Sequence, residues 1–211
     1  DATAIRLEGT AGAGVTTAGG IAIDNIVRSS AYEADSYGLY IGSYVDVPTL
    51  LVRGSVESAI TSDLTDTAYG IYITSNANVP TLTNNGTIAT YTYGEIGAAS
   101  TITDLSNTLT TINNTGTIIA LLIPTDEDPT DDVEPVATGP ATAINLSSNT
   151  VGVTLNQTPD VPFTDDDTTD DDEDNRPDVQ IVGNILLGSG ADTVNLMAGK
   201  IVGNLSFGAG A

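Results

Sequence analysis

The sequence predicts an all-β protein and, within that class, a parallel β-helix (β-solenoid) built from stacked coils. The segment at 37–41, YGLYI, returns 32 residues later at 69–73 as YGIYI. A tighter repeat near the end of the chain places IVGN at 181–184 and again at 201–204, an offset of 20. Periods of a few tens of residues are typical of solenoids, in which each unit buries its apolar face only against its neighbours.

The composition favours strands and turns over helices. Hydrophobic residues make up 40% of the 211, and with two Phe and no Trp the core must consist of Ile, Val, Leu and Ala. Thr, Ser, Asn and Gly dominate the rest, and these residue types favour strands and turns. No stretch shows a convincing 3.6-residue period, so we expect little or no helix. Cysteine is absent, which suits a solenoid because repeated contacts between neighbouring units stabilise it.

The first repeated segment has the period of two that marks a strand with one buried face. Leu39 and Ile41 point to one side and Tyr40 to the other, and the same alternation returns at 71–73. We therefore expect the apolar residues to enter the core. We also expect Tyr72 to lie over Tyr40 on the outside of the next coil.

A second repeated element marks the corners of the coils: a glycine, a small polar residue and a β-branched residue. It occurs at 54–56, 86–88 and 116–118. Glycine allows a positive φ at a corner, while the polar residue should face water and the β-branched residue should enter the core. The segments 2–7 and 141–146 resemble the first repeated strand, so the coils are expected to extend through both.

The last repeat indicates how short a coil becomes. With a period of two, Ile181 and Ile185 share an inner face and Asn184 takes the outer one, while Ile201 begins the next coil directly above Ile181. At about 3.3 Å per residue, a coil of this length has room for two or three short strands and their corners. Successive coils should pair as parallel sheets about 4.8 Å apart. Coil length is expected to vary from about 20 residues to near 32 where a loop protrudes.

Two acidic segments interrupt the repeat. Residues 124–140 and 158–178 are rich in Asp, Thr and Pro and have no apolar period, a composition typical of solvated loops. The repeat resumes after both, so we place no domain boundary at either and interpret residues 1–211 as one solenoid segment with irregular coils. The chain starts without Met and stops inside a repeat, and we expect it to be part of a longer mature polypeptide.

The charge of the chain excludes several partners. A net charge of −23 arises from 28 acidic and five basic residues, and repulsion of this size opposes binding to nucleic acid or to an anionic membrane. No stretch approaches the roughly 20 apolar residues of a membrane span, so no membrane insertion of this segment is expected. Outside the acidic segments the surface is a nearly neutral mixture of Thr, Ser and Asn with almost no Lys, as is common in secreted bacterial fibres.

Several glycine-rich motifs resemble a known group of proteins. The segments Asn85–Ile88, Thr115–Ile118 and Gly203–Gly210 are similar to the units that tile the passenger regions of bacterial autotransporters (type V secretion) and related large surface adhesins. The resemblance implies a right-handed parallel β-helix that is exported across both membranes and is displayed at the cell surface or released. Surface-layer proteins and phage fibres use similar coils, so the assignment within this group stays open.

The residue inventory argues against an enzyme. There is no His and no Cys, which excludes Ser-His and Cys-His pairs and histidine-bound metals. Polysaccharide hydrolases need only two carboxylates at a fixed separation, and acids on the coils such as Asp24, Glu57 and Asp66 could supply them. No convergent set is apparent, and Asp46 is replaced by Asn78 in the next repeat. We predict a non-enzymatic role, with a polysaccharide-processing β-helix using paired carboxylates as the alternative.

The second acidic segment is a candidate calcium site because hard carboxylate oxygens are the ligands that Ca²⁺ prefers. A calcium-stiffened filament subunit is therefore a further alternative. The segment lacks the turn glycine and the distal bidentate Glu of a helix-loop-helix site, and a solvated loop that keeps a fibre soluble is the simpler interpretation. The candidate ligands are Asp165, Asp166, Asp167, Asp170, Asp171 and Asp172.

Tyrosine is concentrated in one part of the chain, since all eight tyrosines lie within 32–93. Tyr40 over Tyr72, with Tyr91 and Tyr93 nearby, would form an outward aromatic strip able to stack on sugars or on a protein surface. Stacked identical side chains also stabilise a β-helix by themselves, so both interpretations stay open. The strip is the expected place for adhesion to a cell-surface glycan or protein, and the unpaired sheet edges of the end coils are the expected place for self-association.

The predicted function follows from these features together. We expect an extracellular bacterial β-helix segment, at the cell surface or secreted, that serves as an adhesin, a stiff spacer or an assembly element of a surface layer or filament. No cofactor other than calcium is expected. The prediction depends on identical side chains forming columns along the coils.

Overall fold

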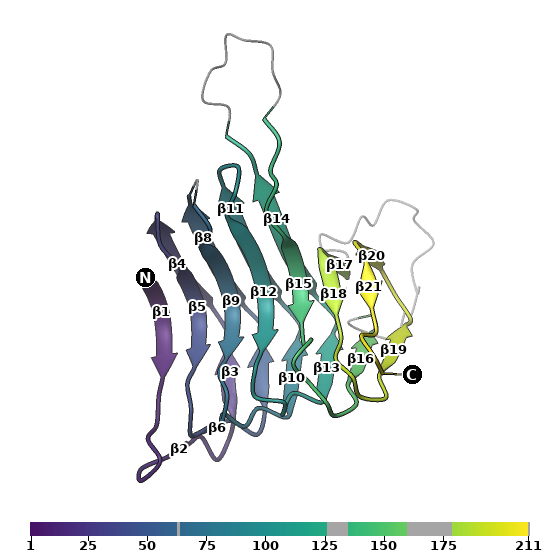
Figure 1. Cartoon of the computed structure of the whole chain (residues 1–211). Helices are drawn as coiled ribbons and strands as arrows, with labels where there is room; N and C mark the ends of the chain where they lie inside the picture. Colours follow the sequence, from purple (N-terminus) through teal and green to yellow (C-terminus); the bar gives the residue numbers. More distant parts are fainter. Residues whose placement is uncertain (63, 126–134, 160–178, 211) are drawn as a thin grey trace, which may run out of the picture.

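The computed structural model describes residues 1–62, 64–125, 135–159 and 179–210. Every regular element in these residues is a β-strand, and no helix occurs among them. Twenty-one strands form three large parallel sheets and one two-stranded sheet. The strands of each sheet follow one another along a common axis, with the two termini at opposite ends of the stack (Figure 1). The predicted all-β, parallel, solenoid-like architecture is confirmed.

Sheet I contains one strand from each of seven coils. In spatial order these strands are β1 (Ala2–Leu7), β5 (Ser36–Ile41), β9 (Thr67–Ile73), β12 (Ala98–Asp104), β15 (Ala141–Asn145), β18 (Asn184–Leu186) and β21 (Leu205–Ser206). A small two-stranded sheet pairs the next strands of the first two coils. These are β2 (Val15–Thr16) and β6 (Val45–Asp46).

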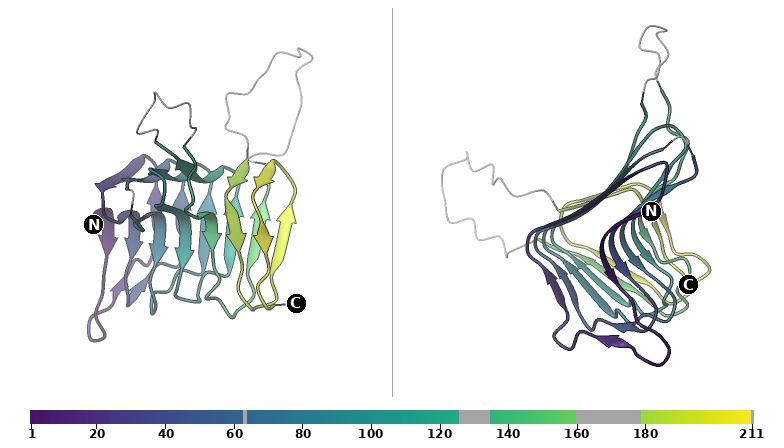
Figure 2. Two further views of the ribbon diagram at one scale, coloured as in Figure 1. Left: turned by 45° about the horizontal axis from the view of Figure 1, so that its top comes forward. Right: turned by 90° about the vertical axis from the view of Figure 1, so that its left-hand side faces the viewer.

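Sheets II and III contain six strands each and complete the coils. Sheet II consists of β3 (Ile21–Ile23), β7 (Leu50–Val52), β10 (Thr81–Asn84), β13 (Thr111–Asn114), β16 (Thr154–Gln157) and β19 (Thr193–Leu196). Sheet III consists of β4 (Ile26–Tyr32), β8 (Ser55–Thr61), β11 (Thr87–Tyr93), β14 (Thr117–Ile123), β17 (Gln180–Val182) and β20 (Lys200–Val202). Viewed along the axis, the coils lie behind one another and the three sheets surround the interior (Figure 2).

The interior is filled by columns of aliphatic side chains, one from each coil. The central members of the main column in sheet I are fully buried, whereas Ile5 at one end is 37% exposed and Leu205 at the other is 39% exposed. Burial of such a side chain contributes about 1.5–3 kcal/mol, so each coil depends on both of its neighbours for this stabilisation. In register, the column consists of Ile5, Leu39, Ile71, Ile102, Ile144, Ile185 and Leu205.

The strand register confirms the two sequence repeats. Tyr40 pairs with Tyr72 on the neighbouring coil, and Ile181 pairs with Ile201. Coil length varies more than predicted, because Ile102 pairs with Ile144, which is 42 residues further along the chain. That long coil contains the first acidic segment, whose composition gives no indication of how many residues lie between the paired strands.

The repeated corner glycines are needed for a different reason from the predicted one. Gly54, Gly86 and Gly116 are not among the residues with positive φ. A Cβ on Gly86 would lie 2.0 Å from the carbonyl oxygen of Gly54, and a Cβ on Gly116 would lie 2.1 Å from that of Gly86. Adjacent coils therefore stack backbone on backbone at this corner, and a side chain would force them apart. Positive φ occurs at other corners, such as Gly199 before β20 (φ 67°).

Both acidic segments lie between strands that belong to the stack. Residues 124–140 lie between β14 and β15, and residues 158–178 lie between β16 and β17. The repeat does resume after each, since Ile102 pairs with Ile144 across the first segment and Leu155 pairs with Val194 across the second. Residues 126–134 and 160–178 lie outside the described residues, so their structure as loops stays a prediction. Within the described ranges, no helix is long and apolar enough to cross a membrane.

Candidate binding face on sheet I

The side chains on the outer face of sheet I differ in size and polarity from coil to coil. Two columns of side chains run along it, and each passes from an N-terminal polar residue through two tyrosines to smaller polar residues, although the second column ends in a leucine. The first column contains Thr3, Tyr37, Tyr69, Ser100, Thr142 and Asn184. The second contains Arg6, Tyr40, Tyr72, Thr103, Asn145 and Leu186.

Tyrosines three residues apart share the outer face because the strand changes phase between them. Tyr37 and Tyr40 are partly exposed, while Gly38 and Leu39 are both buried. A Cβ on Gly38 would lie 2.8 Å from the carbonyl oxygen of Gly70 on the next coil and 2.8 Å from a side-chain carbon of Val56 in sheet III, so the next coil and sheet III together leave room only for glycine. A strict period of two places Tyr37 on the opposite face of the strand from Tyr40. The repeated pattern Tyr-Gly-x-Tyr is the sequence signal that would have identified the shared face.

The four tyrosines Tyr37, Tyr40, Tyr69 and Tyr72 form what we call the tyrosine cluster. The rings of Tyr37 and Tyr69 stack with their centroids 5.0 Å apart and their planes at 8°. The rings of Tyr40 and Tyr72 stack at 5.6 Å and 25°, which confirms the predicted column. Tyr69 and Tyr72 meet edge to face at 4.7 Å. Each such pair contributes about 0.5–1.5 kcal/mol beyond the burial of area, so the cluster stabilises two coils against each other.

Burial favours the neutral form of three phenol groups in the cluster, those of Tyr37, Tyr69 and Tyr72. Burial raises the pKa of Tyr37, and the nearby carboxylate of Asp35 raises it further. The Tyr37 hydroxyl donates to Asp35 Oδ2 at 3.1 Å, while Asp35 Oδ1 accepts from the backbone N–H of Thr67 at 2.8 Å on the next coil. Burial also raises the pKa of Tyr69 and of Tyr72. These three phenols are therefore neutral at physiological pH.

A cation covers the N-terminal end of the cluster. The guanidinium carbon of Arg6 lies 4.1 Å from the centre of the Tyr40 ring, a cation–π contact. Arg6 Nε also donates to Glu8 at 2.8 Å, and this hydrogen bond raises the pKa of Arg6 and lowers that of Glu8. One end of the aromatic stack is therefore already occupied.

The other end of the cluster opens onto a hollow of about 300 Å³. Tyr69 and Tyr72 line it on one side, and β12 and β15 supply its floor with small polar residues. These are Ser100, Thr103, Thr142 and Asn145, with Pro140 at the rim. The hollow exists because hydroxyl side chains on β12 follow the bulky rings on β9 in the same two columns.

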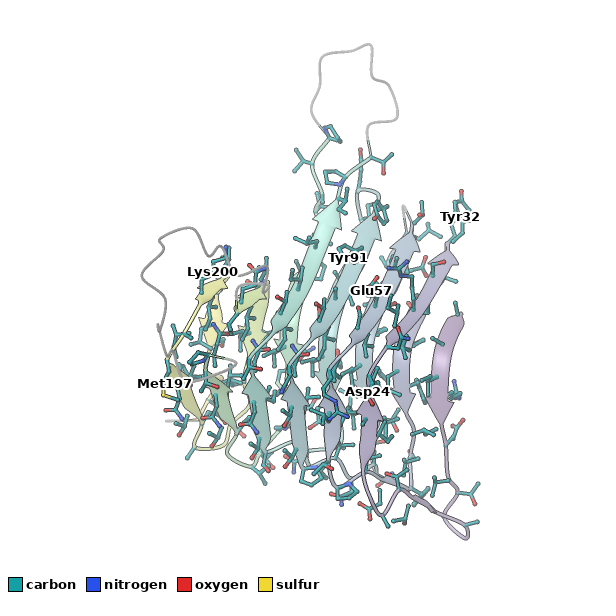
Figure 3. All side chains as sticks on the ribbon, turned by 180° about the vertical axis from the view of Figure 1, so that it is seen from behind. Asp24, Tyr32, Glu57, Tyr91, Met197 and Lys200 are labelled. Atoms are coloured by element: carbon teal, nitrogen blue, oxygen red, sulfur yellow. The ribbon has the colours of Figure 1, made fainter. Side chains whose placement is uncertain are left out.

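Tyr91 and Tyr93 do not join this cluster. They lie on β11 in sheet III, whereas Tyr40 and Tyr72 lie on sheet I. Figure 3 shows Tyr91 and Glu57 on the side of the molecule opposite to the viewer of Figure 1. The structure therefore divides the predicted strip into two surfaces, because the period of two fixes which side of a strand is exposed but not which sheet the strand belongs to.

The surface around Tyr91 is built differently. Glu57 on β8 accepts hydrogen bonds from Arg28 on β4, at 2.8 Å from Nε and 2.5 Å from Nη2. A hollow over Ala59 lies between this ion pair and the rings of Tyr91 and Tyr93. Burial raises the pKa of Tyr91. The rings here have an ion pair beside them, whereas the hollow beside Tyr69 and Tyr72 is lined only by uncharged residues.

Several carboxylates on the coils bond to neighbouring groups rather than to one another. Asp46 Oδ1 accepts from the Asn78 amide at 2.7 Å on the next coil, so the Asp-to-Asn replacement between repeats avoids stacking two like charges. Asp24 pairs with Arg53 at 2.6 Å. In the described part of the chain, no three Asp or Glu residues come together as a metal site would require. The predicted calcium ligands Asp165–Asp167 and Asp170–Asp172 lie outside the described residues.

Comparison of the chain with protein-family models, with curated proteins and with solved structures finds no match. The resemblance to autotransporter passengers therefore rests on the glycine-rich motifs alone. What the coils and their outer faces are able to do has to be inferred from their geometry.

Proposed function

We propose that the chain is a non-enzymatic segment of a bacterial cell-surface or secreted fibre, in which a right-handed parallel β-helix serves as a stiff spacer and carries an adhesive face. The observation that carries the proposal is the unbroken column of aliphatic residues from Ile5 to Leu205, which links all seven strands of sheet I. A solenoid of this kind grows along one axis and has an extended surface in place of a central pocket.

A buried amide ladder supports the role as a stiff element. Asn84 Nδ2 donates to Asn114 Oδ1 at 2.8 Å, and Asn114 Nδ2 donates to Gln157 Oε1 at 3.4 Å. Gln157 Nε2 then donates to the carbonyl oxygens of Ala198 and Lys200 at 3.0 and 3.1 Å. The three side chains are fully buried. Sliding or tilting one coil against the next would leave these polar groups unpaired in the interior, at a cost of about 1–3 kcal/mol each.

The tyrosine cluster supports the adhesive role. It presents four aromatic rings on one outer face, and aromatic residues of this kind are enriched where proteins meet their partners. Glu57, Asp24 and Asp46 on the coils are bonded to Arg or Asn side chains, which favours display over catalysis. We propose a cell-surface glycan or protein as the partner, since the net charge of −23 opposes nucleic acid and anionic lipid.

Antibody labelling of intact cells tests the proposed location. Antibodies raised against the folded chain should label intact cells of the source organism, or detect the protein in the medium, without permeabilisation. Labelling that appears only after permeabilisation would show that the proposal is wrong.

Incubation with surface polysaccharides tests the non-enzymatic role. We expect no release of new reducing ends above the level of a buffer control. Turnover that a single Asp→Asn change abolishes would instead identify a hydrolase with paired carboxylates.

A further inference from the structure

We infer that the hollow beside Tyr69 and Tyr72 binds one pyranose unit of an uncharged glycan. The sugar ring stacks on the open end of the tyrosine cluster. The inference deepens the adhesive role proposed above and rests on it for the choice of a glycan as partner. It assigns the site to the junction of β9 and β12, which is only one part of the outer face of sheet I.

The first step of the argument is that the aromatic stack ends with an open ring face. Tyr37 covers one face of the Tyr69 ring at 5.0 Å, close to the spacing between coils. The opposite face is turned toward the next coil, where the column continues with Ser100. In the second column Tyr72 is followed by Thr103 in the same way. Where a third pair of rings would lie, the structure has the hollow.

The size and lining of the hollow suit a sugar ring. Its volume of about 300 Å³ is at the lower end of the range for small-ligand sites. A pyranose has an apolar C–H face that packs on an aromatic ring and hydroxyls around its edge that need hydrogen-bond partners. The hollow offers a ring face on one side and hydroxyl and amide groups on its floor.

The floor hydroxyls are nearly buried, with Ser100 8%, Thr142 7% and Thr103 3% exposed, but they keep unused hydrogen-bonding capacity toward the hollow that they line. Ser100 Oγ and Thr103 Oγ1 lie 2.7 Å apart and share one hydrogen bond, which leaves one hydroxyl proton and further lone pairs unused. Among the described residues, Thr142 Oγ1 has no hydrogen-bond partner, and neither has the amide nitrogen of Asn145, whose Oδ1 accepts from Ser147. The floor therefore presents both donors and acceptors, as a sugar edge requires.

The charges around the hollow favour a neutral sugar over an acidic one. No Lys or Arg is among the residues that line it, so a uronate or sialate carboxylate would have no cationic partner there. Asp35 lies beside Tyr37 at the neighbouring position, and the net charge of the chain is −23. Long-range repulsion would weaken binding of any anionic glycan.

Titration calorimetry of the full chain with four defined oligosaccharides tests the inference. The probes are cellotetraose, mannotetraose and chitotetraose, which are uncharged, and trigalacturonate, which is anionic. We expect at least one uncharged probe to bind with a Kd of about 1 mM or tighter, and trigalacturonate to bind about tenfold more weakly or not at all.

The most decisive test is a variant that fills the hollow. Ser100→Tyr places a third ring on the column and should weaken binding by about tenfold or more, while its melting temperature stays at or above that of the unmodified chain. Tyr69→Ala should weaken binding similarly because it removes the stacking face. Tyr91→Ala removes a comparable half-buried ring from sheet III and is the matched control, so it should leave binding unchanged.

Three results would overturn the inference: no binding of any uncharged probe up to about 10 mM, unchanged binding by a folded Ser100→Tyr variant, or an equal loss in Tyr91→Ala. If Tyr69→Ala fails to fold, Ser100→Tyr decides alone. Surface labelling without saccharide binding would refute this site and leave the proposed location intact. Saccharide binding by a protein found only inside cells would support the site and refute the proposed location.

Discussion

The central coils, from β5 to β14, and the last coils, from β17 to β21, follow one plan but bury their apolar residues to different degrees. The segment IVGN occurs at 181–184 and again at 201–204. Ile181 is fully buried, whereas Ile201 is only partly buried and Val202 is 51% exposed. The local sequence is the same, so the difference comes from the neighbours: Ile181 lies between Ile118 and Ile201, while Ile201 has a described neighbour on one side.

Strand length separates the two regions further. In sheets I and III the central strands have six or seven residues, while those of the last coils have two or three. The most faithful repeat in the sequence therefore has one copy that is well buried and one that is largely exposed. Burial in this solenoid depends on having a coil on each side and on strand length, and the fidelity of the repeat does not by itself provide it.

The largest expected effect comes from the matched pair Ile181→Ala and Ile201→Ala. Removing a fully buried Ile side chain costs about 2–5 kcal/mol, since the lost transfer free energy and the cavity both contribute. The same change at Ile201 should cost about 1 kcal/mol or less, because much of that side chain already contacts water. Urea unfolding followed by circular dichroism measures both. Equal destabilisation would show that the contrast between the two regions is wrong.

The connection between the two regions is tested by Gln157→Ala. Gln157 is fully buried on β16 and bonds to the backbone of the last full coil at Ala198 and Lys200. Its removal should cost about 1–3 kcal/mol, because the buried Asn114 amide loses its acceptor. We expect the loss of hydrogen-exchange protection to concentrate in β19 and β20 and to spare β9.

The matched control for that experiment is Asn156→Ala on the outer face of the same strand. Asn156 donates to Asn113 at 2.9 Å and accepts from Asn195 at 2.7 Å, but its side chain is in contact with water. Its removal should cost about 0.5 kcal/mol. A larger effect at Asn156 than at Gln157 would mean that the outer ladder, not the buried one, holds the last coils.

Much of this architecture could be predicted from the sequence, because a column of identical residues leaves a periodic trace. The pairs Tyr40–Tyr72 and Ile181–Ile201 were both predictable, and both are confirmed. The pairing of Ile102 with Ile144 was not, since no repeated motif connects these strands and the acidic segment between them hides the coil length.

The candidate site was less predictable than the fold. The phase change at Gly38 brings Tyr37 into the cluster, and it occurs where Gly70 of the next coil and Val56 of sheet III approach Gly38, contacts between residues distant in sequence. The hollow depends on Ser100 and Thr103 following Tyr69 and Tyr72 in register. β12 shares no sequence motif with β5 and β9. Only the strand pairing in the structure therefore shows that hydroxyl side chains replace the tyrosine rings at these positions.

Alkaline pH should distinguish the two regions, because all eight tyrosines lie within 32–93. Burial raises the pKa of Tyr37, Tyr69, Tyr72 and Tyr91 in the folded chain. In the unfolded chain these phenols ionise near pH 10. The unfolded state then binds fewer protons than the folded state, so stability is constant below about pH 10 and falls as the pH rises above it.

Thermal melts between pH 7 and pH 11.5 measure this loss, which we expect to reach on the order of 5 °C. The phenols are partly exposed, and solvent screening keeps the effect modest. Tyr37→Phe should reduce the alkaline slope, since Phe has no proton to lose. A slope that Tyr37→Phe leaves unchanged, or an alkaline loss of hydrogen-exchange protection confined to β19 and β20, would contradict the assignment of this effect to the central coils.

The smallest expected effect is at the amide pair on the outside of the last coils. Asn204 donates to Asn184 Oδ1 from its side chain at 3.2 Å and from its backbone at 3.1 Å, but Asn204 is exposed. Water replaces the side-chain hydrogen bond, so Asn204→Ala should cost about 0.5 kcal/mol or less in urea unfolding. If this change cost more than Ile201→Ala, amide bonding rather than apolar burial would hold the last coil in place, and exposure would no longer explain why the two regions differ.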